Sequence, residues 1–81
     1  MDRRSTTAED RAAFRALGLT IKRLRKEKRL PRPALAEKAG ISERWLIQIE
    51  AGAEAKWGEL RHIAYALDVL PQDLIQASEI D

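Results

Sequence analysis

Arg44 and Gln48 are the side chains whose type and spacing best suit a specific chemistry in this sequence. They lie four residues apart, so on a helix they would project from the same face, one turn apart. An arginine can pair with O6 and N7 of guanine, and a glutamine can pair with N6 and N7 of adenine. The same two residues on an isolated helix would simply be solvated. Whether Arg44 and Gln48 contact bases or are only solvated depends on the helix that carries them and on what that helix packs against.

Other kinds of site are limited by residue type. The 81 residues contain no Cys and one His, His62, which excludes a disulfide framework and an ordinary Cys/His zinc site. Without cysteine no Cys/His pair is possible, and any Ser/His/Asp triad would have to use His62. The place of His62 beside Ile63 on an amphipathic segment indicates a structural role instead. The four glycines are scattered and form no loop that could cradle a phosphate. We expect no enzymatic activity, no metal and no cofactor.

Charge is unevenly distributed along the chain. The net charge is only +2, yet residues 1–40 hold 12 basic and 5 acidic side chains, whereas residues 41–81 hold 3 basic and 8 acidic ones. This asymmetry favours a polyanionic partner, and a solvated helix face is the alternative. The densest basic segment comprises Lys22, Arg23, Arg25, Lys26, Lys28, Arg29 and Arg32.

The composition is typical of one small folded domain. Charged residues make up 35% and apolar residues 44% of the chain. The N-terminal segment is charged from its second residue and has no apolar stretch of the kind found in secretory signals. No stretch without a charged side chain exceeds six residues, which is too short to span a bilayer. We expect a cytoplasmic protein without membrane association.

Apolar spacing predicts a first helix that carries the basic segment. Phe14, Leu17 and Ile21 follow a helical stripe that continues to Leu24. Gly18 interrupts this stripe, so we expect the helix to begin late or to bend there. Thr7 could cap an earlier start, because Asp10 follows three residues later. The helix is expected to end near residue 30, because a residue that precedes proline avoids the helical region.

Two short helices joined by a tight turn follow. Pro33 is tolerated in the first turn of a helix, and Gly40 is a suitable residue to end it. Ser42 is then a good cap for a helix over residues 43–51, which Gly52 ends. This order of helix, short turn with glycine, and helix predicts a helix-turn-helix unit.

A helical wheel divides the second of these helices into two faces. Its inner face is expected to contain Ser42, Leu46 and Ile49, while the opposite face contains Glu43, Arg44, Ile47 and Gln48. The wheel therefore directs Arg44 and Gln48 away from the core. Trp45 falls on the flank between the faces.

The last third of the chain predicts two more helices. Leu60, Ile63, Ala64 and Leu67 share one helical face. A final helix is expected from residue 71, with Leu74 and Ile75 facing inward. No segment alternates with the period of a strand. We expect an arm over residues 1–13 that could extend the first helix, a domain over residues 14–78 and a frayed end over residues 79–81.

The segments LPRPALAEKAGISERWLIQIEAG (residues 30–52) and LRHIAYALDVLPQDLI (residues 60–75) resemble the Xre/Cro-type helix-turn-helix family, whose fold is that of the phage repressors. The resemblance runs from Leu17 to Ile75. It implies an all-α domain of five short helices. It also implies a sequence-specific DNA-binding transcriptional regulator, expected here to be a repressor that binds a near-palindromic operator as a homodimer.

The resemblance also assigns roles to individual residues. Arg32 occupies the position that contacts DNA phosphate, with Lys28, Arg29 and Lys56 as further phosphate candidates. An Arg–Glu pair that joins the first and third helices corresponds to Arg25 and Glu50. The base-reading positions correspond to Ser42, Glu43, Arg44 and Gln48, with Trp45 beside them. Dimerisation through the last helix would involve Leu70, Leu74, Ile75 and Ile80.

Several residues depart from the family pattern. Pro31 replaces the usual hydroxyl-bearing cap, Ile47 is apolar in the middle of the outward face, and Lys56 is the one basic residue in the loop over residues 51–57. These departures keep open the alternative of a protein-interaction module with weakened or lost operator binding. A non-specific architectural DNA binder is a third hypothesis. The Glu43 carboxylate could simply be favoured by the helix dipole in the first turn, or it could accept a hydrogen bond from N4 of cytosine. Trp45 could be half-buried packing or a protein contact.

Overall fold

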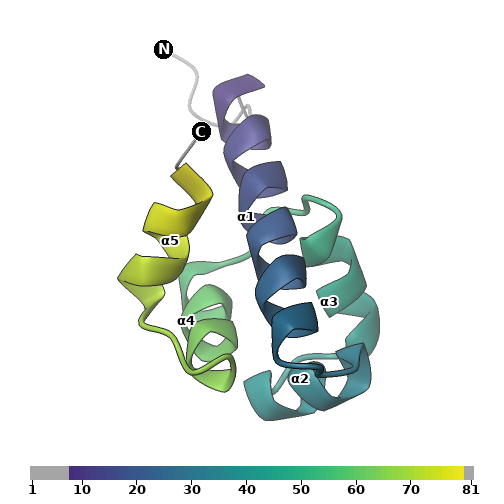
Figure 1. Cartoon of the computed structure of the whole chain (residues 1–81). Helices are drawn as coiled ribbons and strands as arrows, with labels where there is room; N and C mark the ends of the chain where they lie inside the picture. The colour runs from purple at the N-terminus through teal and green to yellow at the C-terminus, as the bar shows by residue number, and fades with distance from the viewer. Residues whose placement is uncertain (1–7, 80–81) are drawn as a thin grey trace.

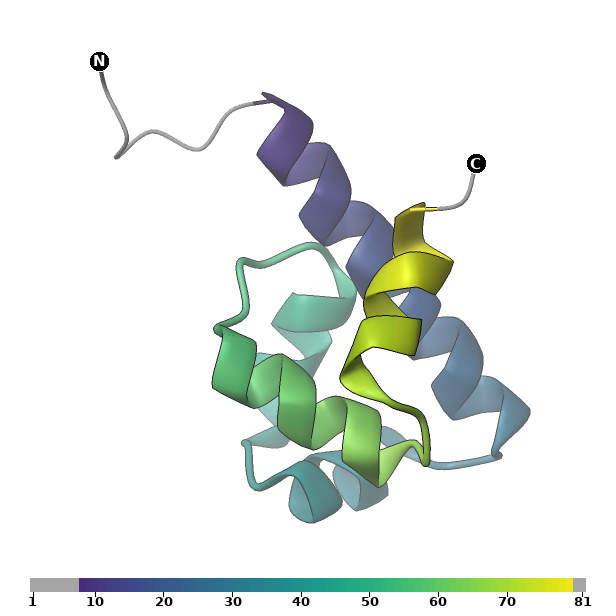
Figure 2. The same ribbon diagram turned by 90° about the vertical axis from the view of Figure 1, so that its left-hand side faces the viewer.

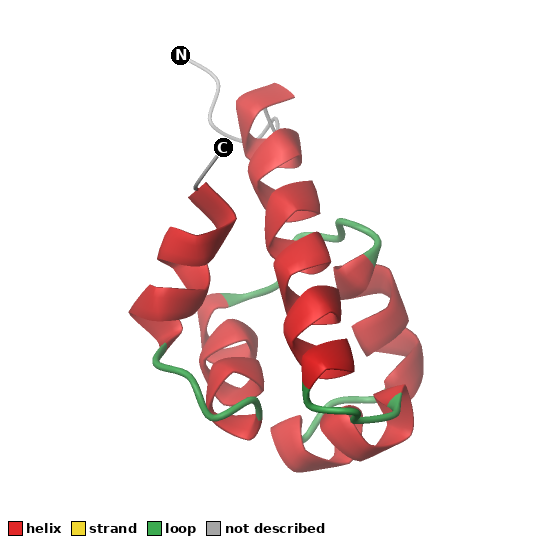
Figure 3. Ribbon diagram, viewed as in Figure 1, coloured by secondary structure: helices red, strands yellow, loops and turns green. Residues whose placement is uncertain are grey.

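Five α-helices make up the regular structure of residues 8–79 (Figure 1). The computed structural model describes residues 8–79, and within that range every connection between helices is a turn or loop, with no strand (Figure 3). This confirms the expected all-α, five-helix fold. The helices are α1 (Ala8–Glu27), α2 (Arg32–Ala39), α3 (Glu43–Glu50), α4 (Trp57–Ala66) and α5 (Pro71–Glu79).

The long helix α1 forms the spine of the domain. It runs from Ala8 through Gly18, so the expectation of a late start is wrong. The proposed cap at Thr7 lies outside the described residues. Gly18 is tolerated because a Cβ there would collide with the backbone of α3, meeting the carbonyl oxygen of Ile49 and lying 2.7 Å from that of Glu50. The missing side chain therefore allows close contact between the two helices, which offsets the cost of glycine within a helix.

The other helices pack around α1 to enclose one core. α1 contacts α5 on one side and α3 on the other, and α2 packs against α3 and α4 (Figures 1 and 2). Burial of the apolar side chains between these helices is the main stabilising contribution to the fold. The core comprises Leu17, Ile21, Leu35, Ala36, Ala39, Leu46, Ile49, Ala55, Leu60, Ile63, Ala64, Leu67 and Leu74.

The last helix contributes Leu74 to this core, which confirms the expected inward orientation of this residue. Leu74 is 1% exposed, because α5 turns this side chain toward the rest of the domain. Its expected role in a dimer interface is therefore wrong. Leu70 is exposed and Ile75 is half-buried, whereas Ile80 lies outside the described residues. The helical conformation continues through Glu79, one residue into the segment expected to fray.

Candidate nucleic-acid interface

The turn between α2 and α3 is fixed by local hydrogen bonds. Gly40 adopts a left-handed conformation with φ of 74°, and the N–H of Ile41 donates to the Ala36 carbonyl at 3.0 Å. Ser42 then caps α3, because its Oγ accepts from the Trp45 N–H at 3.0 Å. The predicted cap is confirmed, but Ser42 is exposed and does not face the core. Ser42 precedes the helix and has an extended backbone, so the helical wheel does not predict the direction of its side chain.

The two faces of α3 agree with the helical wheel. Leu46 and Ile49 are buried against the core. The opposite face is exposed, and it carries Glu43, Arg44, Ile47 and Gln48. Arg44 and Gln48 are therefore presented to solvent one turn apart, as their spacing predicts.

Trp45 does not join these two residues on the outward face. It is half-buried and packs against the core, as in the packing alternative. Its Nε1 is shielded from solvent and has no hydrogen-bond partner among residues 8–79. The indole N–H is thus not presented to a base edge, contrary to the expected place of Trp45 beside the readout residues.

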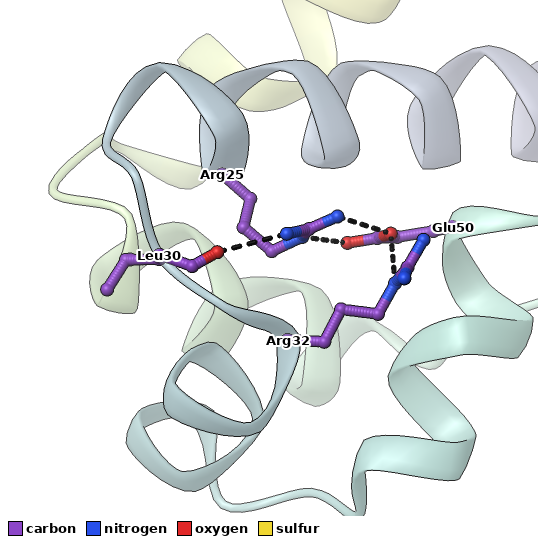
Figure 4. A network of polar contacts seen from close by, with 4 residues as sticks. All are labelled: Arg25, Leu30, Arg32 and Glu50. Carbon is purple, nitrogen blue, oxygen red and sulfur yellow. Dashed lines mark hydrogen bonds and ion pairs between the residues drawn. The ribbon is translucent and has the colours of Figure 1, made fainter.

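Arg25 and Glu50 form the predicted ion pair between α1 and α3 (Figure 4). Arg25 donates from Nε to Oε2 of Glu50 at 2.7 Å and from Nη2 to Oε1 at 3.3 Å. The two side chains are 8% and 2% exposed, which confirms that the pair is buried. Arg25 Nη1 also donates to the Leu30 carbonyl at 3.0 Å. The pair therefore fixes both the C-terminal end of α3 and the turn that precedes α2.

Arg32 joins the same carboxylate, which sequence reasoning missed. Its Nε donates to Oε1 of Glu50 at 2.9 Å, and its side chain remains 35% exposed (Figure 4). Glu50 thus accepts three hydrogen bonds from two guanidinium groups, which satisfies a carboxylate that is costly to bury alone. The residues are 18 positions apart, so no local pattern in the sequence could have indicated this contact.

The basic segment is therefore not one continuous solvated surface. Arg25 and Arg32 both bind Glu50, and Arg23 forms an exposed pair with Glu27 at 3.2 Å. Lys28 and Arg29 are exposed where α1 ends, beside the turn that leads to α2. These two residues keep the exposed position that a phosphate contact requires.

Lys56 also keeps an exposed position, at the start of α4. Its backbone N–H donates to Oε1 of Glu59 at 2.9 Å, which satisfies one free donor of the first turn. The structure thus places Lys56 at a helix terminus, with its side chain at the surface.

Other types of site find no support in the described part of the chain. Within residues 8–79, no group of three acidic or histidine side chains could hold a metal ion. No helix in this range is long and apolar enough to cross a membrane. His62 is exposed on α4, so its side chain is not part of the core.

A family model described as a helix-turn-helix domain matches residues 16–77, from α1 through most of α5. The chain belongs to this helix-turn-helix family. The match is consistent with the resemblance to the Xre/Cro-type family and includes the whole α2–turn–α3 unit. A search of curated proteins found no match. The helix-turn-helix assignment indicates a DNA-binding role in regulation, and domains of this kind are typically non-enzymatic.

Proposed function

We propose that this helix-turn-helix domain is a sequence-specific transcriptional regulator that places α3 in the major groove of DNA. The exposure of Arg44 and Gln48, one turn apart on the outward face of α3, carries the proposal. An α-helix fits the major groove, where each base pair presents a distinct pattern of donors and acceptors. A bidentate contact from either side chain discriminates between bases by about 1–3 kcal/mol. Ser42 and Glu43 lie at the exposed start of the same helix and could contact neighbouring bases.

Basic residues around α3 supply the contacts to the DNA backbone. We assign this role to Arg32, Lys28, Arg29 and Lys56, all of which are at least partly exposed. Phosphate contacts position a protein on the duplex and provide most of its sequence-independent affinity.

We further propose that the domain acts as a repressor and binds a near-palindromic operator as a homodimer. Leu70 is 52% exposed, and the half-buried Ile75 lines an apolar groove with Phe14 and Leu60. A two-fold dimer would place the two α3 helices about 34 Å apart, one turn of DNA.

The dimer interface can be tested at Leu70. Leu70→Asp places a charge on this exposed apolar surface and is expected to give monomers in sedimentation experiments. Leu74→Asp is unsuitable for the test, because it would bury a charge in the core and unfold the domain. A dimer that persists in Leu70→Asp would remove the start of α5 from the interface.

A protein-interaction module is the second candidate function. Ile47 favours it, because this apolar side chain is 44% exposed on the outward face of α3. Exposed apolar side chains are common in protein interfaces, although Ile47 could equally contact the methyl group of thymine.

Selection from random DNA duplexes tests the proposed function. A regulator is expected to enrich one sequence and to bind it about a thousandfold or more tightly than unrelated DNA. A non-specific architectural binder would lose affinity as salt rises but would have no preferred sequence. Selection without any enriched sequence would reject the regulator and leave the architectural binder or the protein-interaction module.

A further inference from the structure

We propose that Glu50 is a positioning residue for DNA binding, which holds the Arg32 guanidinium ready for a phosphate before DNA arrives. This inference rests on the proposed function and deepens its account of phosphate contact. The three residues concerned meet where the end of α1, the start of α2 and the end of α3 converge (Figure 4).

The two arginines bind Glu50 in different ways. Arg25 is 8% exposed and donates from all three of its guanidinium nitrogens, to Glu50 and to the Leu30 carbonyl. Arg32 is 35% exposed, and within residues 8–79 it donates through Nε alone. Arg25 is thus committed to the interior, whereas Arg32 retains donors for a partner from outside.

The charges of this cluster do not balance. One carboxylate faces two guanidinium groups, so the cluster carries one positive charge in excess at its exposed edge. A guanidinium is a rigid planar fork, so a bond at Nε also fixes the direction of Nη1 and Nη2. Phosphate accepts such paired donors well. The chemistry that fits this edge is therefore a phosphate oxyanion of the DNA backbone.

The same bond could instead serve only to hold α2. Pro31 precedes the helix and forms no side-chain cap bond, so the contact between Arg32 and Glu50 could simply anchor the start of α2. A positioning role predicts more than this. An arginine that is already immobilised loses little rotamer entropy on binding, a saving that corresponds to about two- to twelvefold in affinity.

Salt titration of DNA binding by full-length variants separates the two roles. Arg32→Ala is expected to lower the magnitude of the slope of log K against log salt by about 0.9 per bound protomer, because each protomer loses one phosphate contact. Arg32→Lys keeps the charge and hence the slope, but it is expected to weaken binding by about two- to twelvefold because the fixed fork is lost. Arg61→Lys, the same exchange at an exposed position on α4, is the control and should change neither quantity.

Nitrogen-15 NMR of the free protein provides a second measurement. The Arg32 Nε–H should exchange slowly with water, in contrast to the Nε–H of exposed Arg44. Glu50→Gln should accelerate this exchange if the variant folds, and the Arg32 variants carry the test if it does not. Circular dichroism must show each compared variant to be folded at the temperature of the binding assay.

The outcomes distinguish this inference from the proposed function. If wild-type protein binds DNA and Arg32→Lys binds equally tightly, or if Arg32→Ala leaves the salt slope unchanged, the positioning role of Glu50 is rejected while the regulator stands. If wild-type protein binds no duplex under any salt condition, the proposed function fails and the inference fails with it.

Discussion

The two ends of α3 are held in opposite ways. At its first turn, exposed Ser42 closes one local hydrogen bond, and Arg44 stands free in solvent. At its last turn, Glu50 is buried with two arginines, and the backbone lies against Gly18 of α1. The last turn is fixed by long-range polar contacts, whereas the exposed positions of the first turn, which carry Ser42 and Arg44, are free to vary. The fixed end sets the direction of the helix, and the free end can change its chemistry at little cost to folding.

Loss of Glu50 should have the largest effect on stability. Glu50→Ala leaves two guanidinium groups without their carboxylate, one of them fully buried, which is expected to lower the free energy of unfolding by about 3–5 kcal/mol. Urea denaturation measures this loss. Glu27→Ala, which removes the exposed partner of Arg23, is the control and should cost less than about 1 kcal/mol. Similar losses in the two variants would contradict the contrast between buried and exposed pairs.

Gly18→Ala should have the next largest effect. The added methyl group would meet the Ile49 and Glu50 carbonyls, so α3 must shift at a cost of about 1–3 kcal/mol. This exceeds the gain in helix propensity, which is at most about 1 kcal/mol. Gly58→Ala in α4 is the matched control, because nothing lies within 4 Å of its Cβ position, and it should stabilise the fold slightly. If both exchanges stabilise the protein in chemical denaturation, the close contact of α1 with α3 is wrong.

Removal of the cap at the free end should cost less. Ser42→Ala loses the hydrogen bond to the Trp45 N–H, with an expected cost of about 1 kcal/mol in thermal unfolding. Ser42→Asp retains a cap oxygen and should restore most of the stability. A failure of aspartate to do so would indicate that the cap bond does not hold this end.

Arg44→Ala should have the smallest effect on stability and a large effect on recognition. The side chain is exposed, so the free energy of unfolding should change by no more than about 0.5 kcal/mol. Selection from random duplexes should nevertheless show relaxed choice at one base pair, equivalent to about 1–3 kcal/mol. An unchanged sequence preference would remove Arg44 from base readout.

Much of the fold could be predicted because its signals are local. Apolar spacing located the helices, and the wheel separated Leu46 and Ile49 from Arg44 and Gln48. Helix caps could also be predicted, because the cap at Ser42 is a contact with Trp45, only three residues away. The ion pair between Arg25 and Glu50 was expected from the family resemblance, because no periodicity links residues 25 positions apart.

The errors have a common physical origin in long-range packing. The low helix propensity of glycine suggested that Gly18 disturbs α1. Its actual role depends on another helix, because the missing side chain allows α3 to pack closely against α1. The contact between Arg32 and Glu50 is an omission of the same kind, because the buried carboxylate lies on another helix. The dimer role of Leu74 followed from the family resemblance, whereas the apolar spacing alone already directed this side chain inward, where it is buried. Local patterns therefore predict the exposed residues of the site, whereas its buried support was predicted only for Arg25 and Glu50, through the family resemblance.

The carboxylate shared by Arg25 and Arg32 also has a consequence for motion. It joins the end of α1, the start of α2 and the end of α3, so none of these segments can open locally without breaking at least one charged contact with Glu50. Their amides should therefore exchange with deuterium as one cooperative unit. The surface that carries Arg44 and Gln48 would thus be preformed, and its encounter with a ligand would need no folding step.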